Sequence, residues 1–219
     1  MDHDHQLGLI IHQLLKEKNL ENPVNFEQIA KWDNLENLEL IKEKYAELLI
    51  LMGLSNCMLN SSKTAQRILK MLLQENFSGL DYRNFPSFST LENSFNYQEP
   101  LIAENINFQS TCEHHLVAIK GKAIIAYQPQ NQVIGLKKIN QILHFFAARP
   151  QLQERLTRQV FVVLQYLLKT ENIAIVIKAQ HDCMNNQNIS NDTTWHLTSQ
   201  FGGIFLEDKD LKHSLLNRI

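Results

Sequence analysis

Apolar positions in the first sixty residues recur at the three- and four-residue spacing of amphipathic helices. Residues 7–18 and 35–52 each carry such a stripe, and residues 26–32 form a shorter apolar segment between them. Pro23 separates the first two segments, because proline cannot continue a helix. The pattern predicts a helical N-terminal region over residues 1–60, which is either a packed appendage or a contact between subunits.

The rest of the chain, residues 61–219, alternates between the two-residue period of strands and the helical period. Strands are expected at 102–108, 116–127, 133–136, 173–179 and 193–199, and helices at 62–76, 138–148, 151–169 and 211–216. We also expect a hairpin turn at residues 128–131 and a β-bulge at Gly121. Two strands, two helices and two further strands predict an α+β domain.

Composition and charge narrow the class of protein. The 219 residues include 21 basic and 23 acidic side chains, for a net charge of -2. No half of the chain is strongly basic, so nucleic acid is not an expected partner. No apolar run could span a membrane, no signal peptide is recognisable, and three cysteines including the isolated Cys57 fit a reducing compartment. We therefore expect a cytoplasmic protein that does not bind membranes.

Two short motifs carry the candidate chemistry. Cys112 and His115 lie three residues apart, and Cys183 supplies a second thiol far along the chain. Two thiolates, one imidazole and an open fourth position are typical of a catalytic zinc. His114 and His181 flank these residues, and histidine titrates close enough to neutrality to transfer protons. The pattern indicates zinc-dependent hydrolytic or deaminase-like chemistry; the alternative is a buried free cysteine with two surface histidines.

Longer motifs resemble the GTP cyclohydrolase I family. They follow the family's order from about Ser62 to the C-terminus and include Cys112-Glu113-His114-His115-Leu116-Val117, Lys138-Ile139-Asn140, Gln153-Glu154-Arg155-Leu156-Thr157 and Gly202-Gly203-Ile204-Phe205. The resemblance implies the tunnelling fold, an antiparallel sheet with two helices on one face. It also implies a closed homo-oligomer, a decamer in the family, with active sites at subunit interfaces. The implied reaction converts GTP and water to 7,8-dihydroneopterin triphosphate and formate, the first step of folate and pterin biosynthesis.

The resemblance also implies roles for the residues of the two motifs. Cys112, His115 and Cys183 are expected to hold zinc, and His114 and His181 are expected to shuttle protons. The choice of His115 as the ligand and His114 as the free base comes from the family, because spacing alone cannot separate two adjacent histidines.

Substrate contacts are implied at both ends of the nucleotide. Glu154 is expected to accept hydrogen bonds from the guanine ring N–H and exocyclic amine, beside Gln153. Without the resemblance, Glu154 is an ordinary acidic residue at a helix N-terminus. Lys137, Lys138 and Arg67 are the expected phosphate contacts.

The sequence departs from the family at the phosphate end. Positions that are usually basic in the family hold neutral side chains here: Gln141, Asn185, Gln187 and Ser190. Lys137 is basic where the family often has serine. Charge-assisted hydrogen bonds contribute about 1.5–3 kcal/mol each, so the loss of two would weaken triphosphate binding by about a hundredfold or more.

Two hypotheses follow from these substitutions. The first is a GTP cyclohydrolase I in which Lys137 partly rebuilds the phosphate site. The second is a catalytically altered or inactive paralogue that acts on a different purine or serves as an assembly partner.

Overall fold

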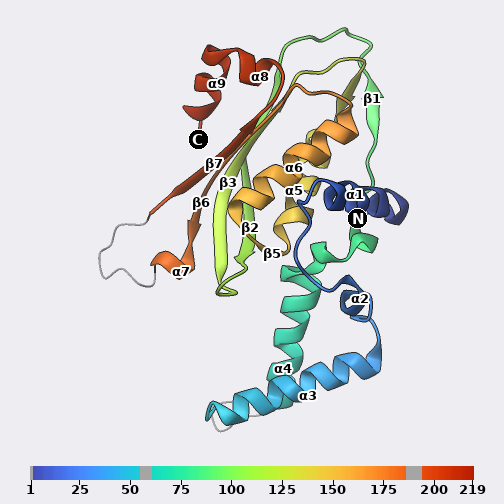
Figure 1. Ribbon diagram of the computed structural model, residues 1–219, viewed down its shortest axis with the longest axis vertical. Coiled ribbons are helices and arrows are strands. Elements are labelled where there is room, and N and C mark those ends of the chain that lie inside the picture. The colour runs from blue at the N-terminus through green and yellow to red at the C-terminus, as the bar shows by residue number, and fades with distance from the viewer. Residues whose placement is uncertain (1, 55–60, 186–193) are drawn as a thin grey trace.

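The computed structural model describes residues 2–54, 61–185 and 194–219. Cys57, Gln187 and Ser190 lie outside these ranges. The described chain forms a body of sheet and helices, from which a helical arm projects (Figure 1). Across the described ranges, every helix is too short or too polar to cross a lipid bilayer.

The main sheet of the described chain has the strand order β5–β2–β3–β6–β7. Its strands are β2 (Leu101–Cys112), β3 (Ala118–Tyr127), β5 (Pro150–Gln151), β6 (Ile173–His181) and β7 (His196–Phe201). The long strands pair antiparallel, and the short β5 pairs parallel with the end of β2. The strands predicted around 102–108, 116–127, 173–179 and 193–199 are confirmed, with ends that differ by a few residues.

Strand β6 contacts apolar layers on both faces of the sheet. Ile173, Ile175 and Ile177 point into the main core, while Ala174 and Val176 join a second, smaller core on the opposite face. Alternate side chains of a strand point to opposite faces, so an unbroken apolar run is the pattern that a doubly covered strand requires.

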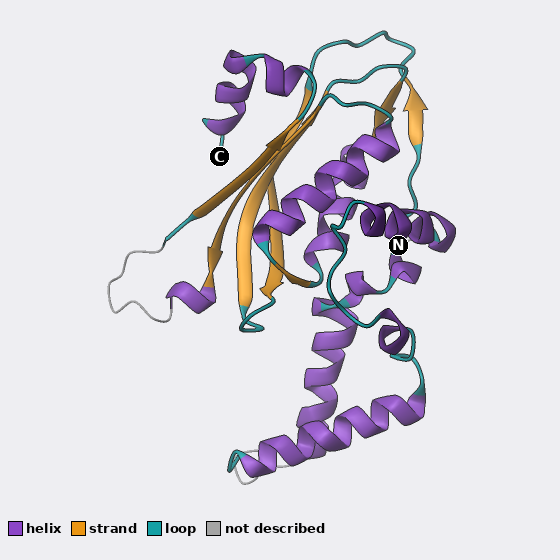
Figure 2. Cartoon of the chain, in the orientation of Figure 1, coloured by secondary structure: helices purple, strands orange, loops and turns teal. Residues whose placement is uncertain are grey.

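Two long helices cover one face of the sheet, α5 (Leu136–Ala147) and α6 (Gln153–Leu168) (Figures 1 and 2). The predicted stripe of α6 is buried at Leu156, Val160 and Val163. The short helices α8 (Ile204–Glu207) and α9 (Lys209–Leu216) contribute to the second core. The structure is therefore α+β, as predicted, with two helices on one face of a mostly antiparallel sheet.

The N-terminal region is helical, as predicted, but its parts differ in how they pack. It contains α1 (His5–Glu17), α2 (Phe26–Ile29) and α3 (Leu35–Leu51), and it is followed by α4 (Ser61–Leu69) and the π-helix η1 (Lys70–Asn76). Ile11 and Leu15 of α1 are fully buried in the main core, so this helix belongs to the body. Helices α3 and α4 pack together and form the arm. Two 3-10 turns, η2 (Ser78–Leu80) and η3 (Tyr82–Asn84), lead from the arm back to the body.

A buried arginine that follows α5 forms hydrogen bonds with the N-terminal region. Arg149 has no exposed surface, and its Nη1 donates to Glu21 Oε1 at 3.0 Å and to Asn22 Oδ1 at 3.2 Å. Its guanidinium lies over the rings of Tyr82, Phe145 and Phe146, with distances of 4.6–4.9 Å to the ring centroids. The ion pair and the aromatic contacts offset part of the cost of burying the charge, while Nε and Nη2 of Arg149 have no hydrogen-bond partner among the described residues.

The predicted β-bulge at Gly121 is wrong. Gly121 pairs regularly with Phe108 on one side and Ala179 on the other, and the irregularity lies in β2, where Asn105 has a φ of 56°. A Cβ at Gly121 would lie 2.5 Å from the Lys178 carbonyl oxygen. The glycine therefore permits close approach of two strands, which is the other common reason for glycine in a strand.

The predicted hairpin at residues 128–131 is also wrong. The strand that follows, β4 (Gln132–Ile134), pairs with β1 (Thr90–Glu92) in a separate two-stranded sheet. The backbone N–H of Ile134 donates instead to the Tyr127 hydroxyl at 2.9 Å.

Candidate metal centre

The centre begins where β2 ends. The turn after Cys112 is closed by two backbone bonds, from Cys112 N to Val117 O at 2.8 Å and from Leu116 N to Cys112 O at 2.9 Å. Leu116 takes a φ of 53°, an uncommon conformation for a side chain of this type. The tight turn brings His115 back beside Cys112.

A third side chain reaches this turn from β6. In the β3–β6 pairing His181 lies opposite Ile119, so the end of β6 meets the start of β3. The short helix α7 (Asp182–Asn185) starts directly afterwards and carries Cys183. Sheet pairing therefore joins two motifs that lie far apart in the sequence.

Cys112, His115 and Cys183 have the separations of a zinc site. The distances are 3.8 Å from Cys112 Sγ to His115 Nδ1 and 3.9 Å between the two sulfurs, and the three ligand atoms all lie within 4.8 Å of one another. Tetrahedral zinc with ordinary bond lengths separates such atoms by roughly 3.5–3.8 Å. Among the described residues both cysteines are free thiols. Cys112 is buried while His115 is exposed, which leaves one side open for a water or substrate ligand.

The Cys183 thiol is affected by its burial and by the neighbouring Cys112. Burial, followed by the nearby Cys112, raises the pKa of the Cys183 thiol. Two adjacent thiolates would repel each other, and a metal ion removes that cost because a coordinating thiol is deprotonated.

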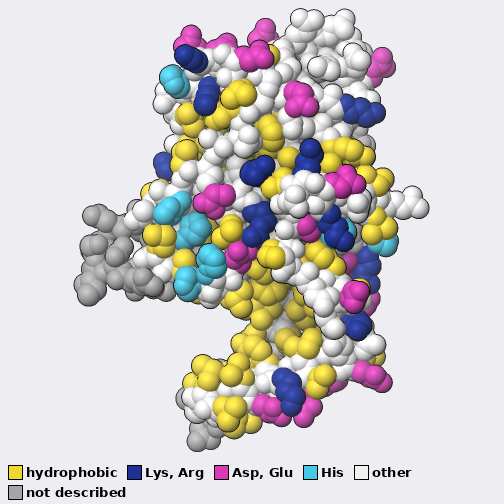
Figure 3. Space-filling view, in the orientation of Figure 1, with side chains coloured by type: hydrophobic (Ala, Val, Ile, Leu, Met, Phe, Trp, Pro, Cys, Tyr) yellow, Lys and Arg dark blue, Asp and Glu magenta, His cyan; other side chains and the backbone are white. Residues whose placement is uncertain are grey.

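His181 lies on β6 beside the centre, and its Nε2 is 3.0 Å from Gln153 Oε1. Burial lowers the pKa of His181, the adjacent His196 lowers it further, and Glu154 acts in the opposite direction. The rings of His181 and His196 are 5.2 Å apart at an interplanar angle of 70°. Histidine side chains gather on this side of the body (Figure 3).

His114 lies on the exposed side of the turn. Its Nε2 is 3.9 Å from Glu113 Oε1. Glu113 in turn accepts two hydrogen bonds from Arg155 of α6, at 2.6 and 3.2 Å, which fix the turn to the helix. The sequence did not lead us to the roles of Glu113 and Arg155, although both lie in the motifs quoted above. The opposite charges of these two residues were the available indication that the two motifs are in contact.

Gln153 and Glu154 begin α6 but point in different directions. Gln153 is buried, and its amide nitrogen faces Ile177 O, His196 O and Thr198 Oγ1 at 3.1–3.2 Å. Glu154 is exposed and close enough to influence His181. Of this pair, only Glu154 presents its side chain to an arriving molecule.

The expected phosphate contacts lie apart from one another within one chain. Lys138 Nζ donates to Ser87 O at 2.6 Å and to Ser87 Oγ at 3.0 Å. Lys137 and Gln141 line a cavity of about 970 Å³ together with Lys120. The Oε1 atom of Gln141 is buried without a hydrogen-bond partner among the described residues.

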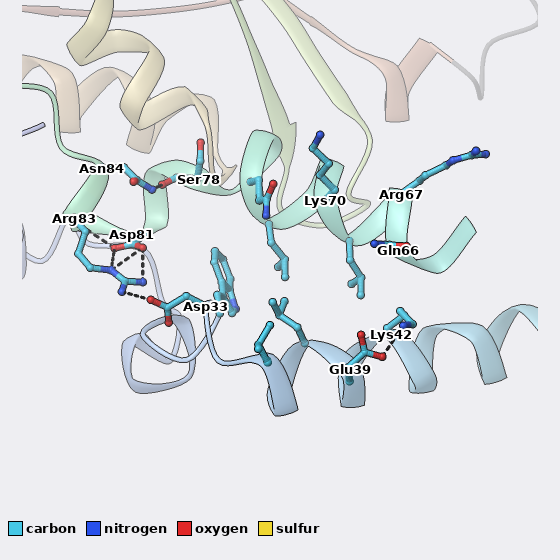
Figure 4. Close-up of a pocket in the computed structure, with 16 residues that line it drawn as sticks. Asp33, Glu39, Lys42, Gln66, Arg67, Lys70, Ser78, Asp81, Arg83 and Asn84 are labelled. Carbon is cyan, nitrogen blue, oxygen red and sulfur yellow. Dashed lines mark hydrogen bonds and ion pairs between the residues drawn. The ribbon is translucent and has the colours of Figure 1, made fainter. Parts of the chain in front are cut away.

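Arg67 lies on the arm. It lines a different cavity, of about 860 Å³, between α3 and α4, and its side chain extends away from the middle of that cavity (Figure 4). Asn185 ends α7, close in sequence to Cys183. The described residues that line these two cavities do not include the Cys112–His115–Cys183 group.

Comparisons with known proteins agree with this geometry. A family model described as GTP cyclohydrolase I matches residues 41–219. Proteins named GTP cyclohydrolase 1 from Tolumonas auensis, Aliivibrio fischeri and Escherichia coli are 38%, 39% and 40% identical to this chain. The alignments cover 100%, 97% and 96% of this chain and 100%, 96% and 94% of those relatives, so the likeness includes the N-terminal region. The chain therefore belongs to the GTP cyclohydrolase I family.

Proposed function

We propose that the protein is a zinc-dependent GTP cyclohydrolase I, a hydrolase that converts GTP and water to 7,8-dihydroneopterin triphosphate and formate. The observation that carries the proposal is the convergence of Cys112, His115 and Cys183 within 4.8 Å, in a chain of this family. These three residues would hold the zinc, which would supply a water activated near neutral pH for attack on the purine C8.

The two remaining histidines handle protons. His181, held by Gln153, and His114, on the exposed side of the turn, each lie within two residues of a proposed zinc ligand in sequence. Ring opening at C8 leaves nitrogen atoms that must be protonated as bonds break, and imidazole groups can donate these protons.

Glu154 recognises the purine. Its exposed carboxylate, in the first turn of α6, accepts hydrogen bonds from the guanine ring N–H and exocyclic amine. A pair of donors facing one carboxylate excludes adenine, whose corresponding edge presents a different pattern of hydrogen-bonding groups.

The phosphate site is assembled from more than one subunit. Arg67 lies on the arm, and Lys137 and Lys138 lie on α5, so one chain keeps these cations in separate places. We assign Arg67 to the site of a neighbouring subunit in a closed homo-oligomer with the tunnelling fold, a decamer by family resemblance. Neighbouring subunits would also cover the edge strands of the sheet.

The free thiols of Cys112 and Cys183 fit a cytoplasmic location, because thiols stay reduced there.

A direct assay tests the proposal. Purified protein is incubated with GTP, and pterin fluorescence is followed after oxidation and dephosphorylation. We expect turnover that chelation abolishes and added zinc restores. Absence of turnover with GTP in metal-loaded, assembled protein would favour the altered paralogue, in which Gln141 and the other neutral substitutions have changed the substrate or the role.

A further inference from the structure

We propose that Gln153 is a positioning residue for His181 and does not contact the purine. It fixes the orientation of the imidazole and decides which of its two nitrogens carries the hydrogen. The inference rests on the proposed function, in which His181 transfers protons, and departs from the role expected for Gln153 as a substrate contact.

The direction of the Gln153 amide follows from its surroundings. Its nitrogen lies 3.2 Å from Ile177 O and 3.1 Å from His196 O. Backbone carbonyls can only accept hydrogen bonds, so the –NH₂ end of the amide must face them. The oxygen end then faces His181 Nε2 at 3.0 Å. The opposite placement would set three oxygens against one another in a buried site.

Two threonines fix the same direction independently. Thr157 Oγ1 lies 2.8 Å from the backbone carbonyl oxygen of Gln153 and 2.7 Å from Thr198 Oγ1. The single hydroxyl hydrogen of Thr157 goes to the carbonyl, which can only accept, so Thr198 must donate to Thr157. Thr198 Oγ1 is then left to accept from the Gln153 amide at 3.1 Å. These hydrogen bonds form a closed circuit, which runs from the side-chain amide of Gln153 through Thr198 and Thr157 to the backbone carbonyl of Gln153.

This circuit determines the state of His181. Because Gln153 Oε1 only accepts, the Nε2 atom of His181 carries a hydrogen, and a neutral ring keeps Nδ1 as its acceptor. The ring of His196 packs edge-on against the ring of His181. The nitrogen that can take up a proton is thereby set before the substrate arrives, a condition for efficient proton transfer.

The same circuit removes Gln153 from substrate recognition. The side chain is 3% exposed, and both ends of its amide have protein partners. A purine contact would break bonds in a buried network, whereas the exposed Glu154 carboxylate can meet the base at no such cost.

The kinetic test uses Gln153→Met, which keeps the length of the side chain but removes its hydrogen bonds. We expect kcat to fall by about tenfold or more while the KM for GTP stays within about twofold. The matched control is Gln159→Met. Gln159 is another buried glutamine of α6, whose amide donates to Leu20 O and Asn22 Oδ1. The control variant should lose stability but keep both kinetic constants.

A spectroscopic test does not depend on turnover. Zinc-loaded protein with ¹⁵N-labelled histidine is examined by NMR, with the His181 signals assigned from a His181→Asn variant. We expect the wild type to carry the hydrogen on Nε2, and Gln153→Met, unlike Gln159→Met, to lose this preference. If GTP is not turned over at all, the proposed function fails and these spectra alone decide the role of Gln153.

Two results would overturn the inference. One is a KM for GTP more than about tenfold higher in Gln153→Met with kcat retained, which would make Gln153 a substrate contact. The other is a wild-type His181 that carries its hydrogen on Nδ1. Should Gln153→Met fail to fold, the wild-type spectra keep the inference testable, because a hydrogen on Nδ1 of His181 would still overturn it.

Discussion

At the scale of single residues, the chemistry of side chains was predictable and their hydrogen-bond directions were not. The thiols and imidazole of the metal centre could be recognised from residue type and order, and their geometry fits zinc. The task of Gln153 could not be foreseen, because its partners Ile177, His196 and Thr198 come from β6 and β7. No local pattern tells which strand atoms will face a helix N-terminus.

Replacement of Cys183 by serine should remove most of the bound zinc. The serine hydroxyl is a poor zinc ligand at neutral pH, and two ligands alone hold the ion weakly. Metal analysis of purified Cys183→Ser should give a small fraction of the wild-type content, which we expect to be about one zinc per subunit. Cys57→Ser is the control for loss of a thiol outside both motifs. Full zinc retention in Cys183→Ser would contradict the ligand assignment.

Glu154→Ala should abolish productive GTP binding and leave zinc content and assembly intact. Two hydrogen bonds to a charged group are lost, so kcat/KM should fall by about a hundredfold or more. Glu207→Ala, which removes another exposed carboxylate at the end of α8, serves as the control. Unchanged turnover in assembled Glu154→Ala would return this residue to an ordinary helix N-terminal role.

Lys137→Ser should raise the KM for GTP by about tenfold, equivalent to about 1.4 kcal/mol. The lysine is exposed on the cavity that also contains the neutral Gln141, so its contact with phosphate should weaken as salt screens it. Steady-state kinetics at low and high salt measure both effects, and Gln141→Arg should lower KM. If KM is unchanged in Lys137→Ser at either salt concentration, other residues hold the triphosphate.

At the scale of elements, periodicity predicted most helices and strands, and the failures have nonlocal causes. Gly121 and residues 128–131 carry turn-like or bulge-like sequences. Gly121 lies against the Lys178 carbonyl of β6, and the strand after residues 128–131 pairs with β1 and not with β3. The helix predicted over residues 62–76 is present, but it changes from α4 to the π-helix η1 at Lys70, a change that its apolar spacing did not indicate.

Arg149→Met should destabilise the join between the N-terminal region and α5. The change leaves Glu21 without its arginine partner but still in contact with His12 and Tyr82, so the loss should lie near the low end of the cost of breaking a buried pair, about 3 kcal/mol. Denaturant unfolding followed by circular dichroism measures the loss. Arg158→Met, on an exposed position of α6, should have little effect. Equal stability of the two variants would show that the buried pair contributes nothing.

At the scale of the whole molecule, we expect a large ring. The arm exposes apolar side chains at Leu35, Leu40, Leu51 and Met52, and an isolated subunit would leave them in water. Light scattering on the purified protein should give a mass many times that of one 25.5 kDa chain. A stable monomer would refute the assembly and, with it, the assignment of Arg67 to a neighbouring site.

The metal centre also has a consequence for how the chain holds together. Cys112 and Cys183 are 71 residues apart, and the segment between them contains β3, α5 and α6. The two sulfurs come together only in the folded chain, so the free energy of binding an ion there would add to the free energy of folding. Zinc would therefore stabilise the fold as well as take part in the reaction. The supply of metal during synthesis would then influence how much folded protein accumulates.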